Sequence, residues 1–68
     1  MSHTSTWNVT GMTCGHCAAS VTEEIAEIPG VESVEVSHEA GTAVVTSTEP
    51  VERAAVEAAV VEAGYELA

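Results

Sequence analysis

The run Gly11-Met12-Thr13-Cys14-Gly15-His16-Cys17 decides how this chain is interpreted, because it joins two segments of different periodicity. Before it, polar and apolar residues alternate over 4–10, which predicts a half-buried strand. After it, apolar residues recur every three or four positions, which predicts an amphipathic helix over 16–28. The run therefore places Cys14 in a loop and Cys17 in the first turn of a helix.

The middle of the chain has the pattern of a β-hairpin. Pro29-Gly30 ends the first helix, because a residue before proline is disfavoured in helical geometry. Valine-rich and β-branched segments predict strands over 31–36 and 42–47. Glu39-Ala40-Gly41 between them predicts the turn of the hairpin.

A second helix and a short last strand complete the pattern. Pro50 suits a first helical position, and Gly64 suits a helix end. The apolar face of this helix is predicted to comprise Val51, Ala55, Ala58 and Val61. Residues 65–67 predict a strand.

The predicted order is thus βαββαβ, over one domain spanning residues 1–68. This order defines an α+β fold of the ferredoxin-like kind: a sandwich of a four-stranded antiparallel sheet with two helices on one face. Trp7 is expected in the core, which is otherwise built from small side chains, since Val and Ala dominate and Phe is absent. His38 shares the parity of the valines before it, so it is expected at the core or its edge.

The chain is strongly acidic. Its formal net charge is −10, from 11 acidic residues, all Glu, against Arg53 as the one strong base. Without a basic patch, binding to nucleic acid is not expected. The charge is typical of a halophile-like surface that stays soluble at high salt, and the alternative is an acidic docking face for a basic partner. Because salt screens repulsion within about 8 Å, we expect the fold to loosen at low salt.

The two cysteines, Cys14 and Cys17, carry the chemistry of the chain. Thiols at a helix N-terminus meet the positive end of the helix dipole, which favours the thiolate. Gly15 between them lets the loop bend so that both sulfurs face one point. Two thiolates without further ligands suit a soft ion of low coordination number, above all Cu(I). A structural Zn²⁺ would require four ligands, and there is no second pair of cysteines.

The motif Gly-Met-Thr-Cys-Gly-His-Cys after the first strand of a βαββαβ chain resembles the heavy-metal-associated domain of copper chaperones and copper-transporting P-type ATPases. The resemblance covers nearly the whole chain. It implies that Cys14 and Cys17 hold Cu(I), and that Met12 packs beneath the loop. Thr13, where zinc- and cadmium-handling relatives carry Asp, favours copper. Tyr65 corresponds to a tyrosine that lies near the site in bacterial copper chaperones.

The resemblance also implies a function of binding and transfer rather than catalysis. A free-standing chaperone would pass the metal by thiolate exchange to a copper-transporting P-type ATPase or another copper acceptor. It would be a monomer without metal, and two facing cysteine pairs could share copper in a dimer. The sequence shows neither a signal peptide nor a stretch able to span a membrane, so a cytoplasmic location without membrane insertion is expected.

Several alternatives stay open. Mercury-resistance proteins of the same family share the motif, so Hg(II) is an alternative ligand. Cys-Gly-His-Cys also occurs in thiol–disulfide enzymes of the thioredoxin fold, although Thr13 and the short chain argue against that context. A purely structural or regulatory domain is a third class. His16 is either an exposed side chain that tunes the thiols or a third ligand, and Tyr65 either packs or supports a sulfur.

Overall fold

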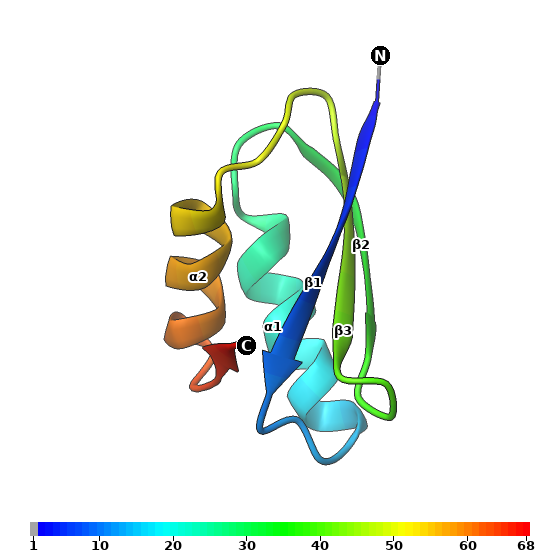
Figure 1. Cartoon of the computed structure of the whole chain (residues 1–68), viewed down its shortest axis with the longest axis vertical. Coiled ribbons are helices and arrows are strands. Elements are labelled where there is room, and N and C mark those ends of the chain that lie inside the picture. Colours follow the sequence, from blue (N-terminus) through cyan, green and yellow to red (C-terminus); the bar gives the residue numbers. More distant parts are fainter. Residues whose placement is uncertain (1) are drawn as a thin grey trace.

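The computed structural model describes residues 2–68, which form a four-stranded sheet with both helices on one face (Figure 1). The elements follow in the order β1 (His3–Thr10), α1 (Gly15–Ala26), β2 (Val31–Ser37), β3 (Thr42–Ser47), α2 (Arg53–Glu62) and β4 (Glu66–Leu67). The strands lie in the order β2-β3-β1-β4, and every neighbouring pair is antiparallel. The ferredoxin-like arrangement predicted from the sequence is confirmed.

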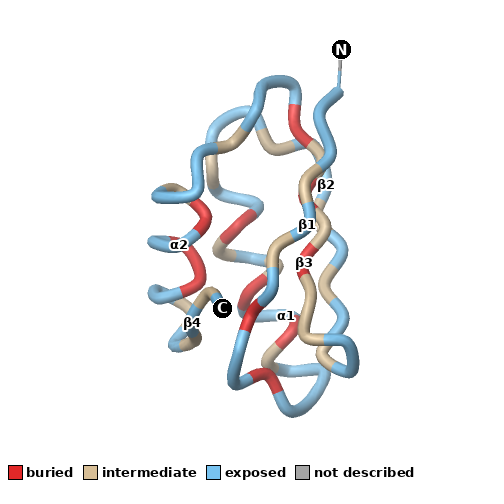
Figure 2. Tube along the Cα trace, viewed as in Figure 1, coloured by how far each residue is buried: buried red, intermediate tan, exposed pale blue. Residues whose placement is uncertain are grey.

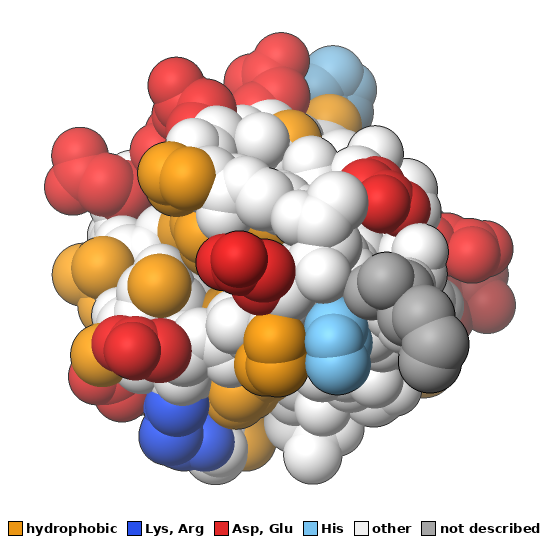
Figure 3. Space-filling view, turned by 90° about the horizontal axis from the view of Figure 1, so that it is seen from above, with side chains coloured by type: hydrophobic (Ala, Val, Ile, Leu, Met, Phe, Trp, Pro, Cys, Tyr) orange, Lys and Arg blue, Asp and Glu red, His pale blue; other side chains and the backbone are white. Residues whose placement is uncertain are grey.

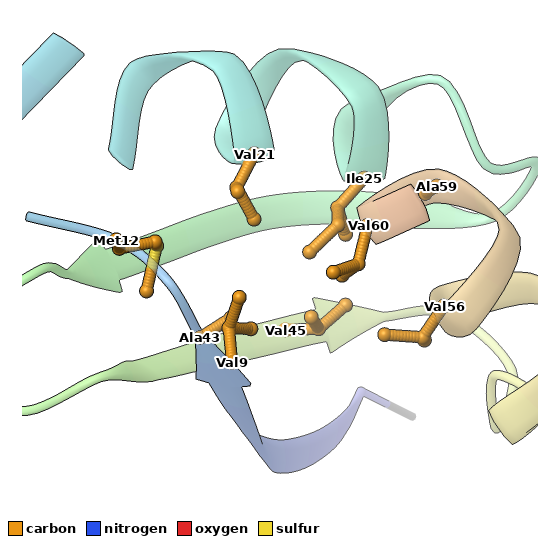
Figure 4. Close-up of a cluster of buried hydrophobic side chains, with 9 residues drawn as sticks. All are labelled: Val9, Met12, Val21, Ile25, Ala43, Val45, Val56, Ala59 and Val60. Atoms are coloured by element: carbon orange, nitrogen blue, oxygen red, sulfur yellow. The ribbon is translucent and has the colours of Figure 1, made fainter. Parts of the chain in front are cut away.

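The core fills the space between the sheet and the two helices (Figures 2 and 4). Val21 and Ile25 of α1 point toward Val45 on β3 and are fully buried. The fully buried side chains of α2 are Val56 and Val60. Trp7 is half-buried at the border of this cluster, rather than at its centre, and its Nε1 donates a hydrogen bond to Ser5 Oγ at 2.9 Å.

The start of α2 differs from the prediction, because Pro50 does not take the first helical position. The helix begins at Arg53, and Glu52 is its N-cap residue, with an extended backbone at φ −81° and ψ 144°. The Glu52 carbonyl accepts hydrogen bonds from the N–H groups of Ala55 and Val56 at 3.1 and 3.2 Å. Pro50 therefore belongs to the connection that approaches the helix, not to the helix itself.

The apolar face predicted for α2 is right only in part, because Val51 and Ala55 are half-buried but Ala58 and Val61 are exposed. The helix buries Val56, Ala59 and Val60, whereas Val61 is 56% exposed and Ala58 is exposed. Since Val and Ala occur on more than one side of this helix, its periodicity does not identify the buried side. Packing decides it, because Val56 and Val60, four residues apart, lie one turn above the other and face the core together.

A register shift in β2 explains how valines at odd spacing share one face. Val31 lies opposite Ser47 and Val34 lies opposite Val45, with the shift falling between Val31 and Ser33. One extra residue of β2 is left unpaired here as a β-bulge, and the strand resumes its alternation after it. As a result both valines lie on the same face of the sheet and pack against the core. His38, just after this strand, is half-buried, as expected for a residue at the edge of the core.

The glutamates are spread over the surface. In the view from above, acidic side chains lie at several separate places on the visible face rather than gathering in one patch (Figure 3). Arg53, the one strong base, donates a hydrogen bond to the Ala68 carbonyl oxygen at 3.4 Å. Neither helix of residues 2–68 has the length and apolar content that a membrane crossing requires.

Candidate metal centre

Residues 11–14, which we call the cysteine loop, connect the end of β1 to the start of α1 (Figure 1). Gly11 turns the chain away from the sheet in the left-handed conformation, at φ +91°. Met12, the next residue, is buried in the core and is 8% exposed. Figure 4 shows its side chain at one end of the core cluster.

Cys14 is the N-cap residue of α1. Its backbone is extended, at φ −155° and ψ 172°, and its carbonyl accepts hydrogen bonds from the N–H groups of Cys17 and Ala18 at 3.1 and 3.3 Å. Cys17 is consequently in the first turn of the helix, as predicted. Gly15 is exposed, and a Cβ at this position would meet nothing within 4 Å, so the bend between the cysteines leaves the surface open.

The two thiols lie side by side at the surface. The Sγ atoms of Cys14 and Cys17 are 3.5 Å apart, and both thiols are free. Cys14 is exposed and Cys17 is half-buried. This separation exceeds the length of a disulfide, about 2 Å, but it lets both sulfurs contact one ion.

The electrostatic environment favours a thiolate at Cys17. Its pKa falls from an ordinary value of 9.0 to about 6, chiefly because the Tyr65 phenol hydrogen-bonds the sulfur, and further because of the Thr13 backbone and the Cys14 thiol. Partial burial opposes this effect. The same contact raises the pKa of Tyr65, since a phenol that donates to a thiolate is harder to ionise.

Thr13 affects Cys17 both through its backbone and through its side chain. Its backbone lowers the pKa of Cys17, and its hydroxyl oxygen lies 4.0 Å from the Cys17 sulfur. From the sequence, Thr13 replaces the Asp of zinc- and cadmium-handling relatives, argues against a thioredoxin-fold context and is expected to support the loop. Thr13 directly precedes the N-cap residue Cys14, and the first turn of α1 brings Cys17 back beside it.

Tyr65 reaches the site from the other end of the chain. Gly64, at φ +95°, ends α2 in a left-handed turn, with its N–H donating to the Val61 carbonyl at 2.9 Å. The Tyr65 N–H donates to the Val60 carbonyl at 3.0 Å, which completes a Schellman motif. This turn directs the half-buried Tyr65 ring toward the cysteine loop, where a resemblance alone had placed it.

The His16 side chain does not form a cluster with the two thiols. It is exposed in the first turn of α1, where its carbonyl accepts a hydrogen bond from Ser20 Oγ at 3.2 Å. Within residues 2–68, no three side chains of the His, Cys, Asp and Glu types come together to hold a metal ion. The donor set of the described structure is therefore a pair of sulfurs, which suits a soft ion that accepts two ligands.

A ferredoxin-like fold that presents two adjacent thiols on its surface defines a class of small metal-handling domains. The family model of the heavy-metal-associated domain matches residues 6–66, and the chain belongs to that family.

Curated relatives include proteins of very different size. The chain is 39% identical over 61 residues to a mercuric reductase from Shigella flexneri, a match that covers 90% of this chain. The chain spans only 11% of that enzyme's length. It is 36% identical over 59 residues to a COP-associated protein from Helicobacter felis, covering 87% of this chain and 89% of that protein.

Solved structures match nearly the whole chain. The CopZ metallochaperone is 31% identical, with a TM-score of 0.89, covering 97% of this chain and 100% of its own. Oxidized MerP from Ralstonia metallidurans CH34 is 33% identical, with a TM-score of 0.86, covering 100% and 96%. A copper binding domain from HMA7, a P-type ATPase, is 28% identical, with a TM-score of 0.86, covering 96% and 89%.

Proposed function

We propose that this chain binds Cu(I) through Cys14 and Cys17 and passes it to a partner protein by thiolate exchange. The observation that carries the proposal is the pair of adjacent sulfurs at the surface, 3.5 Å apart, of which Cys17 is biased toward the thiolate. Thiolates are the form that binds metal, and two soft ligands suit Cu(I). The protein's role is binding and transfer, without chemical conversion of a substrate.

The acceptor in this proposal is a copper-transporting P-type ATPase or another copper-binding protein of the cytoplasm. The similarity to the CopZ metallochaperone and to the copper binding domain of a P-type ATPase supports this choice. An exposed Cys14 supports transfer, because an incoming thiolate could approach a metal ion held at that sulfur, bind the ion and displace Cys14 from it. We further propose that the protein is a monomer without metal. With copper bound, two chains whose cysteine pairs face one another would share the ion and form a dimer.

Hg(II) is the second candidate, since the chain is also similar to a mercuric reductase and to MerP. The sulfur pair suits Hg(II) as well as Cu(I). Zn(II) is less favoured, because Thr13 supplies no carboxylate and residues 2–68 offer no third ligand at the thiols.

The decisive experiment is an anaerobic titration of the reduced protein with Cu(I) against a calibrated chelator, at high salt, with Zn(II) and Hg(II) in parallel. We expect stoichiometric Cu(I) binding that disappears in the Cys14→Ser/Cys17→Ser double variant, with Zn(II) much weaker. His16→Ala is the matched control, and a loss of Cu(I) affinity well beyond tenfold in that variant would make His16 a third ligand. No competitive binding of Cu(I) would contradict the proposal, and binding of Hg(II) alone would favour the second candidate.

A further inference from the structure

The outer edge of β1 is only partly covered by another strand. β4 pairs with β1 at Val9 and Thr10, and Ala68 donates its N–H to the Asn8 carbonyl at 2.8 Å. In the part of the chain that the structure describes, no strand lies beside the outer edge of residues 3–7. Figure 1 shows β4 beside the C-terminal end of β1, with the N-terminal half of β1 extending beyond it. We call the outer edge of residues 3–7 the free edge.

The alternation of an antiparallel ladder identifies the backbone groups that point to the free edge. The Val9 N–H donates to the Gly41 carbonyl at 2.7 Å, on the β3 side, whereas the Asn8 carbonyl points to the β4 side. Since this direction alternates along a strand, Thr4 and Thr6 direct their N–H and C=O groups to the free edge. Both residues are exposed, so these groups are available to pair with an added strand.

The composition of β1 differs from that of the other edge strands. Edge strands commonly carry charges, bulges or short lengths that prevent pairing with another chain. β2 carries Glu32, Glu35 and a register shift, and β4 has only 2 residues. β1 has 8 residues, with no Glu, Asp, Lys, Arg or Pro among them. Of the described elements, only the interior strand β3 also lacks charged side chains, so β1 has the composition of a strand that is paired on both sides.

Trp7 leaves apolar surface uncovered on this strand. Its Nε1 donates to Ser5 Oγ at 2.9 Å, and these two residues lie on the same face of β1. The indole therefore lies along the strand at the border of the core, and it is only half-buried. A β-branched or aromatic side chain on an added strand would cover the rest of the ring, and such cross-strand pairs stabilise a sheet.

We propose that the free edge binds an extended, basic segment of a partner protein, which adds a strand to the sheet through the backbone groups of Thr4 and Thr6. In this mode of binding, backbone hydrogen bonds give affinity and side chains at alternate positions give specificity. The segment alternates β-branched or aromatic residues, which cover Trp7, with Lys or Arg. The basic residues are attracted by the net charge of −10.

The same charge disfavours a second copy of this chain as the occupant, because two chains of net charge −10 repel each other. A basic segment is instead attracted, and salt weakens this attraction by screening it within about 8 Å. The free edge lies outside the cysteine loop, so the proposal goes beyond the proposed function and does not depend on which metal the thiols bind.

The test uses reduced, metal-free protein at the lowest salt concentration that keeps its circular dichroism native. The probe is the peptide acetyl-Lys-Val-Lys-Val-Lys-Val-amide, and the matched control of opposite charge has Glu in place of each Lys. Hydrogen exchange followed by NMR reports on the N–H groups of β1. Trp7 is the one tryptophan of the chain, so its fluorescence reports on peptide binding and gives the Kd.

Two variants separate the backbone from the side chain. Thr6→Pro removes an N–H that points to the free edge and leaves the bonds to β3, a placement that edge strands tolerate for proline. Thr6→Val keeps the N–H and a β-branched side chain, and is therefore the matched control. Circular dichroism establishes that both variants fold, and if Thr6→Pro does not, the exchange pattern of the wild type decides.

Without peptide, we expect the N–H groups of Thr4 and Thr6 to exchange much faster than those of Ser5 and Trp7, which pair with β3. With the Lys peptide at about ten times its Kd, exchange at Thr4 and Thr6 should slow on the order of tenfold. Trp7 emission should shift to shorter wavelength. Thr6→Val should bind as the wild type does, whereas Thr6→Pro should lose most of the binding.

Four results would overturn the inference. The first is no change in exchange or fluorescence with the Lys peptide at about 1 mM, the limit of weak binding. The second is equal binding of the Glu peptide, which would contradict the basic chemistry of the segment. The third is slower exchange confined to β2, or full binding by folded Thr6→Pro, because either would place the peptide elsewhere. The fourth is exchange at Thr4 and Thr6 that slows with protein concentration alone, which would make a second copy the occupant.

Discussion

The Sγ atoms of Cys14 and Cys17 lie 3.5 Å apart, yet the two thiols have different surroundings. Cys14 caps α1 and is exposed, whereas Cys17 is half-buried. The pKa of the Cys17 thiol is lowered to about 6, and the Tyr65 hydroxyl is the largest cause. The pair is therefore asymmetric, although both sulfurs belong to one short loop.

This asymmetry predicts different effects of the two single substitutions on metal transfer. We expect Cys14→Ser to slow Cu(I) transfer more than Cys17→Ser does. Cys14 is exposed and makes the first contact with a donor or acceptor, whereas Cys17, held in the helix, releases last. Stopped-flow exchange of Cu(I) with a thiol-rich acceptor measures both rates. Equal rates in the two variants would contradict this order.

Tyr65→Phe should raise the pKa of Cys17 above about 6, because the largest cause of its lowering is the Tyr65 hydroxyl. The pH dependence of thiolate absorbance in metal-free protein measures the change. Tyr65→Phe keeps the ring, so the loop should stay in place. An unchanged pKa of Cys17 would show that the hydroxyl is not the cause.

The same shift makes stability depend on pH. Folding lowers the pKa of Cys17 from 9.0 to about 6, so the folded state favours the thiolate. This contribution is fully present above the pKa of the unfolded thiol and is lost as the pH falls through about 6. Urea denaturation at pH values from 9.0 down to about 6 measures the free energy of unfolding. We expect this free energy to decline as the pH falls, and to decline less in Cys17→Ser than in the wild type. An equal decline in both proteins would assign it to other groups.

Glu24→Gln should stabilise the fold at neutral pH and low salt. Partial burial, then repulsion from Glu27, Glu62 and Glu23, raises the pKa of Glu24, so its charged form is disfavoured in the folded chain. The gain should shrink in molar salt, which screens repulsion. Glu39→Gln in the β2–β3 turn is the control, because it removes the same net charge elsewhere. Equal thermal shifts in both variants would assign the gain to net charge alone.

Salt should also act on the whole chain. With a net charge of −10 in 68 residues, we expect native circular dichroism and amide spectra at molar salt and a loosened fold at millimolar salt. Identical spectra across this range would contradict the prediction.

Val60→Ala and Val61→Ala should have different effects on the free energy of unfolding, because they lie on the buried and the exposed side of α2. Val60 is fully buried, so its truncation should reduce the free energy of unfolding by about 2 kcal/mol. Val61 is 56% exposed, and its truncation should change this free energy by less than about 0.5 kcal/mol. Chemical denaturation of both variants measures the difference. Similar losses would mean that α2 is rotated from the described orientation.

The sequence by itself determined the order of the elements, the ferredoxin-like fold and the position of both cysteines at the start of α1. These features depend on local signals: alternation in β1, three-to-four spacing in α1, and the turn residues between them. Local backbone preferences act between near neighbours, so a sequence pattern records them directly.

Only the tertiary structure decided which face of α2 is buried, how a bulge brings Val31 and Val34 to one face, and how Gly11 and Tyr65 come together. In α2, several sides are apolar enough to be buried, and the choice depends on the shape of the sheet opposite. Gly11 and Tyr65 lie at opposite ends of the sequence, and they meet because α2 ends beside the loop that follows β1 (Figure 1). Contacts of this kind depend on how the elements pack in three dimensions, which the periodicity of one segment does not contain.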